Sequence, residues 1–172
     1  VLAAGVVAAG LSCVGLASSF GGHDSDTTAT PMSLLVEGHV AVVVPAHWTM
    51  RRVTAGPGSA RLEVTAPDNA TAVLVTQSRV RKGERLVEIA GMLRNALDGQ
   101  QDGIFSQFTP DDRRADRPAA TYREVREGRQ IDWTVFVDDT VRIAVGCQSA
   151  SGTEQAAHDI CDEAIRSAHA II

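Results

Sequence analysis

Most of the chain after residue 33 alternates apolar and polar side chains with the period of two that is typical of β-strands. We expect the first such stretch to turn at Gly38, and GPGS (56–59) to join the next two as a hairpin. Short connections predict an antiparallel meander for the last three. The expected strands lie in LLVEGHVAVVVP, MRRVTA, ARLEVTAP, TAVLVTQS, AATYREVRE, QIDWTVFVD and TVRIAVGC. TPDDRRADRP (109–118) is expected to be a charged loop.

Two other stretches have helical periodicity. Leu86, Ile89, Ala90, Leu93 and Leu97 share one face of a helix expected from about Glu84 to Asp98. A second helix is expected from about Gly152, after a Ser151–Glu154 capping box. Its apolar face consists of Ala157, Ile160, Cys161, Ala164, Ile165 and Ala168. Strands followed by helices in this order predict an α+β fold, an antiparallel β-sheet packed by two helices.

The first twenty residues, VLAAGVVAAGLSCVGLASSF, carry no charge. At about 1.5 Å per residue they span roughly 30 Å, which is the thickness of the bilayer's hydrocarbon core. We therefore expect a transmembrane helix over residues 1–20. A cleaved signal peptide, lipidation at Cys13 and a buried soluble helix remain open as alternatives.

Residues 21–32 are rich in Gly, Ser, Thr, Asp and Pro, so we expect a flexible linker before a folded domain over 33–172. The flank after the apolar segment has no Lys or Arg before Arg51, and positive residues are retained in the cytoplasm. The domain should therefore lie outside the cytoplasm, in the cell envelope. The net charge of −5 argues against a nucleic-acid partner.

Cys147 and Cys161 are expected on facing surfaces of the last strand and the last helix. Cys147 follows Val145 at i+2, and Cys161 follows Ala157 at i+4, so both thiols should point into the layer between sheet and helix. This placement favours a disulfide, which agrees with an oxidising compartment. Two free buried cysteines, and a catalytic or metal role, remain open.

The sequence shows no motif for a catalytic, cofactor or metal site. The pairs Asp111–Asp112 and Asp138–Asp139 are interpreted as turn residues, and His39 and His47 as surface or satisfied side chains. We therefore predict a non-enzymatic protein without a cofactor.

One polar cluster suggests a protein contact, because arginines mix with acidic residues from 111 to 129. A solvated, charge-guarded strand edge is the competing interpretation. The candidate interaction residues are Arg113, Arg114, Asp116, Arg117, Arg123 and Arg126.

Several of these stretches resemble the C-terminal domain of the type VII secretion-associated protein family of mycobacteria and related actinobacteria. The matching words are VEGHVAVVVPAHW, RRVTAGPGSARLEVTAPD, GIFSQFTPDDRRADRPAATYREVREGRQIDWTVFVDD and VRIAVGCQSA, over about residues 34–170. The resemblance implies a gene beside an ESX-type locus, an upstream cytoplasmic portion, one membrane span and this domain outside. VPAHW before an α+β sandwich is also similar to the Mog1/PsbP-like fold.

The expected function is therefore that of a single-pass, membrane-anchored accessory component of a type VII secretion system. Its partners would be the components of the secretion complex, contacted by the extracytoplasmic domain. A small-ligand or lipid-binding module, with an apolar pocket between sheet and helix, is the alternative, followed by a cell-envelope enzyme.

Overall fold

The structure, a computed structural model, describes residues 30–55, 60–126, 129–150 and 154–171. The expected membrane helix, residues 21–29 of the linker, the GPGS turn and Ser151 of the capping box lie outside these ranges. The described elements are β1 (Met32–Glu37), β2 (Val40–Pro45), β3 (Thr49–Val53), β4 (Arg61–Thr65), β5 (Thr71–Arg79), α1 (Leu86–Asp98), β6 (Phe105–Arg114), β7 (Arg117–Arg126), β8 (Arg129–Asp138), β9 (Val141–Ser149), α2 (Glu154–Ser167) and β10 (His169–Ala170).

The strands form two antiparallel sheets. One has seven strands in the order β3-β4-β5-β9-β8-β7-β6, and the other has three in the order β1-β2-β10. This arrangement confirms the predicted α+β class with two helices, and it divides the expected single sheet into two. No helix in the described part of the chain is long and apolar enough to cross a bilayer.

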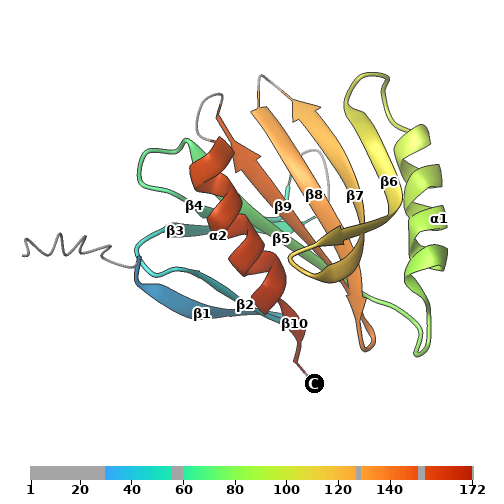
Figure 1. Cartoon of the computed structure of the whole chain (residues 1–172), viewed down its shortest axis with the longest axis horizontal. Helices are drawn as coiled ribbons and strands as arrows, with labels where there is room; N and C mark the ends of the chain where they lie inside the picture. Colours follow the sequence, from blue (N-terminus) through green and yellow to red (C-terminus); the bar gives the residue numbers. More distant parts are fainter. Residues whose placement is uncertain (1–29, 56–59, 127–128, 151–153, 172) are drawn as a thin grey trace, which may run out of the picture.

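Each face of the large sheet is covered by a different layer (Figure 1). Helix α1 covers one face, where Ile89 packs with Leu74 and Trp133. On the other face α2 and the small sheet close a second core, in which Ala164 and Val42 pack with the sheet. The period-two alternation produces both cores, since successive side chains of each strand point to opposite faces.

The segment over residues 109–118 is not the predicted charged loop. It belongs to a hairpin, in which β6 pairs with β7 and Arg114 lies opposite Arg117. The two residues between them, Ala115 and Asp116, have φ values of 47° and 64°, as a tight hairpin turn with a left-handed backbone requires. Pro110 is tolerated because β6 is an edge strand with two register shifts.

Smaller differences concern element ends. Helix α1 begins at Leu86 rather than Glu84, and β1 begins at Met32, the last residue of the expected linker. The two-residue strand β10 was not predicted, because it is too short to show a period.

Candidate functional site

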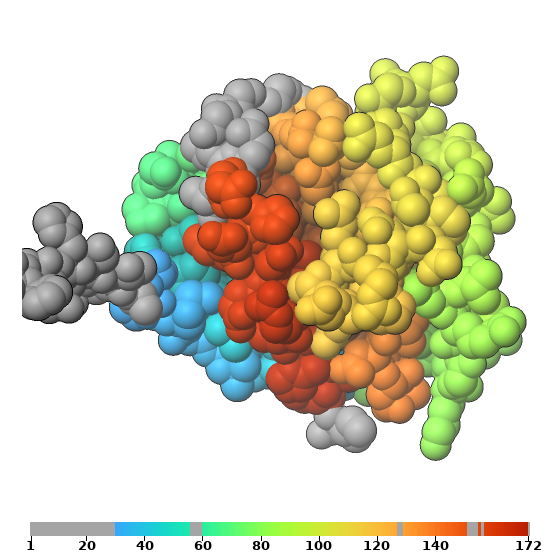
Figure 2. All heavy atoms as spheres, in the orientation of Figure 1, coloured from blue at the N-terminus to red at the C-terminus, as the bar shows by residue number. Residues whose placement is uncertain are grey.

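A cleft of about 260 Å³ lies between α2 and the strands β6 to β9. It exists because α2 packs over β9, β5 and β2 and leaves the neighbouring β7 and β8 partly uncovered. Figure 2 shows α2 and the β6–β7 hairpin on the same face of the molecule. The side chains that line the cleft include Arg114, Thr121, Arg123, Asp132, His158 and Asp162.

The floor of the cleft changes from apolar to polar along β8. Phe136 pairs with Ile143 and belongs to the core, whereas the next residue on that face, Thr134, lies opposite Val145. Thr134 is also opposite Thr121 of β7, and both threonines are buried. Two adjacent hydroxyl groups therefore form the deep part of the floor, where an aliphatic pair would have continued the core.

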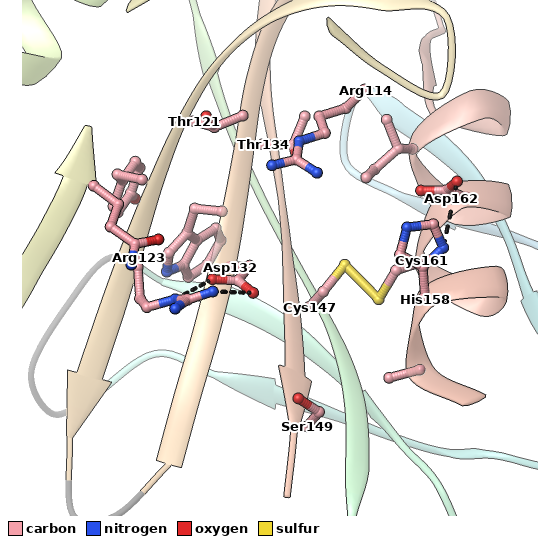
Figure 3. A pocket seen from close by; sticks show the side chains of 15 residues that line it. Arg114, Thr121, Arg123, Asp132, Thr134, Cys147, Ser149, His158, Cys161 and Asp162 are labelled. Carbon is pink, nitrogen blue, oxygen red and sulfur yellow. Dashed lines mark hydrogen bonds and ion pairs between the residues drawn. A yellow bond between two sulfur atoms is a disulfide. The ribbon is translucent and has the colours of Figure 1, made fainter. Parts of the chain in front are cut away.

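The Cys147–Cys161 disulfide forms one wall. It joins β9 to α2 with a Cα–Cα distance of 5.9 Å, which confirms the predicted pairing (Figure 3). Both cysteines line the cleft. The cross-link fixes α2 against the sheet, so the width of the cleft at this point is covalently limited.

An ion pair and a histidine–carboxylate contact lie at the rim. The Arg123 guanidinium donates to both oxygens of Asp132, at 2.7 and 3.1 Å (Figure 3). On α2, Nδ1 of His158 lies 3.6 Å from an oxygen of Asp162, one helical turn away. The hydrogen bond from Arg123 to Asp132 raises the pKa of Arg123 further above its ordinary value. The rim therefore presents fixed charges of both signs.

Asp112 supports the floor from β6. Its carboxylate accepts hydrogen bonds from the Thr121 hydroxyl at 2.9 Å and from the Arg113 amide at 2.7 Å, and it pairs with Arg114 at 3.3 Å. Burial alone would raise the pKa of Asp112, but these hydrogen bonds and the Arg114 charge outweigh it and lower that pKa. Asp112 is therefore a bonded anion and differs from the solvated turn residue that the sequence suggested.

The six residues predicted to contact a protein partner do not share one surface. Arg114 and Arg123 line the cleft. Arg113 and Asp116 belong to the β6–β7 turn, where the Arg113 guanidinium donates to the Asp116 carbonyl at 2.6 Å.

Arg117 is used inside the fold. Its guanidinium donates to the Ala168 carbonyl at 2.6 Å and to the Arg166 carbonyl at 3.4 Å. It also lies 4.4 Å from the centre of the Phe136 ring. Arg117 therefore caps the C-terminal end of α2 and fixes the hairpin against it.

Arg126 lies on the opposite face of the sheet from Arg123, because three positions separate them on a strand. It pairs with Glu124, whose other oxygen accepts the Trp133 indole N–H at 2.8 Å. Burial raises the pKa of the neighbouring Tyr122, and the Glu124 charge adds to the rise. This group belongs to the layer under α1.

Sequence reasoning missed the partners that α2 and β8 contribute. Neither His158 nor Asp132 was among the candidate residues, and Asp132 was expected only as part of a strand. Their positions in the sequence could have indicated this role. Asp132 lies between the apolar residues of β8 and so points to the opposite face, and Asp162 directly follows Cys161 on α2. In the described ranges no cluster of three or more His, Cys, Asp or Glu side chains could hold a metal ion.

Comparison with solved structures identifies the fold. The cyanobacterial PsbP protein CyanoP from Synechocystis matches with a TM-score of 0.58 and 13% identity, over 85% of this chain and 96% of that one. The fold is PsbP-like. A Bacteroides thetaiotaomicron protein matches with a TM-score of 0.53 and 12% identity, over 81% of this chain. The match spans about half of that protein, at 48% of its length.

A third structure, LpqN of Mycobacterium tuberculosis, described as involved in cell envelope biogenesis, has a TM-score of 0.47 and 8% identity, over 81% of this chain and 90% of that one. No family model and no curated protein sequence matches the chain. Identities this low show the PsbP-like fold alone. The resemblance to type VII secretion-associated proteins stays a prediction.

Proposed function

We propose that this PsbP-like domain is the extracytoplasmic part of a non-enzymatic accessory component of a type VII secretion system, and that it binds a partner protein in the cleft beside α2. The observation that carries the proposal is the cleft itself, a hollow with a hydroxyl floor and a rim of fixed charges of both signs. The type VII assignment rests on the resemblance of the sequence.

A protein segment suits this cleft for two reasons. Its polar rim is reachable, since the side chains of Asp132 and His158 are 51% and 57% exposed. Its walls are preorganised by the disulfide and by the Arg117 cap, which lowers the entropy lost on binding. Paired charges at a rim select partners by complementarity more than they add affinity.

The proposed location is the cell envelope, with a single membrane span over residues 1–20. A disulfide persists in oxidising compartments and is rare in the cytosol, which supports a domain outside the cytoplasm.

The test is site-specific photo-crosslinking of the full-length protein in its native membrane. A benzoylphenylalanine in place of His158 would face the cleft, and one in place of Met92, which is 50% exposed on α1, would serve as the matched control. We expect secretion-channel components to crosslink from His158 and not from Met92. Equal labelling from both positions, or labelling of unrelated envelope proteins alone, would reject the proposal.

A small-ligand module remains the second candidate, because the cleft lies between sheet and helix as that hypothesis requires. Its volume of about 260 Å³ is close to the lower end of ligand pockets, roughly 300 Å³. Both polar and apolar groups line it, whereas the hypothesis predicted an apolar pocket. Native mass spectrometry of the purified protein would show an added mass that Thr134→Leu removes, since a leucine fills the floor.

A further inference from the structure

The outer edge of β1 is an unprotected strand edge in the part of the chain that the structure describes. Among the described residues no strand pairs with this edge, which lies at the margin of the molecule (Figure 1). Exposed strand edges promote pairing with other chains, and proteins usually guard them with charge, proline, bulges or a covering element. From Met32 to Val36 the strand carries none of these.

The other sheet edges of the described chain are guarded. Edge strand β3 carries Arg51 and Arg52, with side chains 72% and 63% exposed. Edge strand β6 has two register shifts and Pro110. β10 has only two residues, and Ser167 of α2 accepts the free Val43 amide of β2. β1 is therefore the exception among the sheet edges of the described residues.

The free backbone groups of β1 belong to the residues whose side chains are exposed. The Ala46 amide donates to the Pro31 carbonyl, so the narrow hydrogen-bonded pairs with β2 fall at Pro31 and at every second residue after it. The amides and carbonyls between those positions point away from β2. They belong to Met32, Leu34 and Val36, whose exposed fractions are 38%, 62% and 54%.

We propose that β1 pairs antiparallel with β1 of a second copy of this chain, across a two-fold axis at Leu34. In that register Leu34 meets the partner's Leu34, and Met32 meets the partner's Val36. All three free residues then form hydrogen-bonded pairs, and their side chains form one apolar stripe on the outer face. A shift by two residues in either direction leaves one of the three unpaired.

The charges agree with this register. Glu37 is the one charged residue of β1, and the two-fold axis places the two copies of it at opposite ends of the joint. Arg52 already binds it through two hydrogen bonds of 2.9 and 2.6 Å, which lower the pKa of Glu37. A second copy therefore brings no like charges together, and symmetry makes the stripe complementary to itself.

The test uses the full 172-residue chain carrying Cys13→Ser, because Cys147 and Cys161 are paired and an introduced thiol is then the one free thiol. Leu34→Cys would place two thiols on residues about 5.5 Å apart at their Cα atoms. That distance lies inside the disulfide range of about 4.4–6.8 Å. In phosphatidylcholine vesicles with a mild oxidant, we expect most of the Leu34→Cys chain to migrate as a reducible dimer.

Two controls define the register. Ser33→Cys is one residue away on the other side of the strand, and Met50→Cys is similarly exposed, at 57%, on the guarded edge of β3. Both are expected to stay monomeric. A mixture of Met32→Cys and Val36→Cys chains should crosslink, and each alone should not. The proposal is overturned if Leu34→Cys stays monomeric or if Ser33→Cys crosslinks as readily.

A charge on the edge gives an independent measurement. Leu34→Lys should abolish the dimer in sedimentation of the detergent-solubilised chain, while Met50→Lys leaves it unchanged. Both positions are exposed, so at a concentration low enough for the unmodified chain to be monomeric, the thermal unfolding midpoints of all three chains should match. A dimer that survives Leu34→Lys would contradict the proposal. The proposed β1–β1 contact lies on the small sheet and does not involve the cleft. Loss of the dimer would therefore leave the proposed function untouched, and the reverse also holds.

Discussion

Removing the guanidinium of Arg117 should destabilise the domain much more than removing that of Arg113. The two arginines belong to the same hairpin, and each donates to a backbone carbonyl at 2.6 Å. Arg113 bonds within its own exposed turn, whereas Arg117 bonds the end of α2 and lies over the Phe136 ring. The pair of substitutions Arg117→Met and Arg113→Met therefore isolates the contribution of the helix cap.

The magnitude follows from the contacts. Leaving a buried carbonyl without its partner costs about 1–3 kcal/mol, and loss of the cation–π contact adds about 0.5–1 kcal/mol. The Ala168 residue whose carbonyl Arg117 binds is fully buried. We expect Arg117→Met to lower the free energy of unfolding by about 2–3 kcal/mol, and Arg113→Met by no more than about 0.5 kcal/mol.

Thermal unfolding of the full chain in mild detergent, followed by circular dichroism, measures this difference. For a chain of this size about 1 kcal/mol shifts the midpoint by roughly 2–4 °C, so Arg117→Met should lose about 4–12 °C. Hydrogen exchange should accelerate in the last turn of α2. The loss in unfolding midpoint for Arg117→Lys should be intermediate, since lysine keeps the positive charge but lacks the two guanidinium nitrogens that donate to two carbonyls. Equal losses for both methionine variants, or full stability of Arg117→Lys, would refute the assigned cap.

Three further predictions concern the same layers. Replacing Cys147 and Cys161 together with alanine removes a cross-link with a sequence separation of 14, and should lower the free energy of unfolding by about 3 kcal/mol. The unfolding midpoint of this variant should no longer change when a reductant is added. Gly146→Ala should lower the free energy of unfolding by about 1–3 kcal/mol in denaturant titration, because its new methyl group would meet an indole ring at 2.9 Å. The control Gly91→Ala on α1 meets open space and should raise the free energy of unfolding by about 0.5–1 kcal/mol. The lowered pKa of Asp112 means that its stabilisation is present above the ordinary pKa, about 3.9, and is lost as the pH falls through the folded value. Asp112→Asn should therefore make the free energy of unfolding fall less steeply as the pH is lowered through the acid range. The same fall in Asp112→Asn and the unmodified chain would contradict the assignment of Asp112 as a hydrogen-bonded anion.

Most elements could be predicted from the sequence because their periodicity is a local property. The strands around Val64, Val73 and Val145 and the helix around Ile89 each show one apolar face within a few residues. The β6–β7 hairpin escaped prediction, because its turn is formed by Ala115 and Asp116 rather than by the usual Asn-Gly or Asp-Gly.

The cleft could be predicted only in part. The disulfide followed from the phase of two cysteines on adjacent elements, and the structure confirms it. The charged residues were recognised as a cluster, but their division between the cleft, the α2 cap and the α1 layer was not visible. Strand parity separates Arg123 from Arg126, yet only the packing shows that Arg117 reaches Ala168, fifty-one positions away.

The α+β class and the positions of most elements follow from local patterns in the sequence, and the spacing of two cysteines favoured the disulfide, since each depends on residues close together in the chain. Which face α2 covers, where its coverage ends, and which arginines are used internally follow only from the packing of the folded chain. That packing also leaves β1 with an edge that no strand of the described chain pairs with. These features depend on contacts between segments distant in sequence, and a local pattern of apolar and polar residues carries no information about such distances.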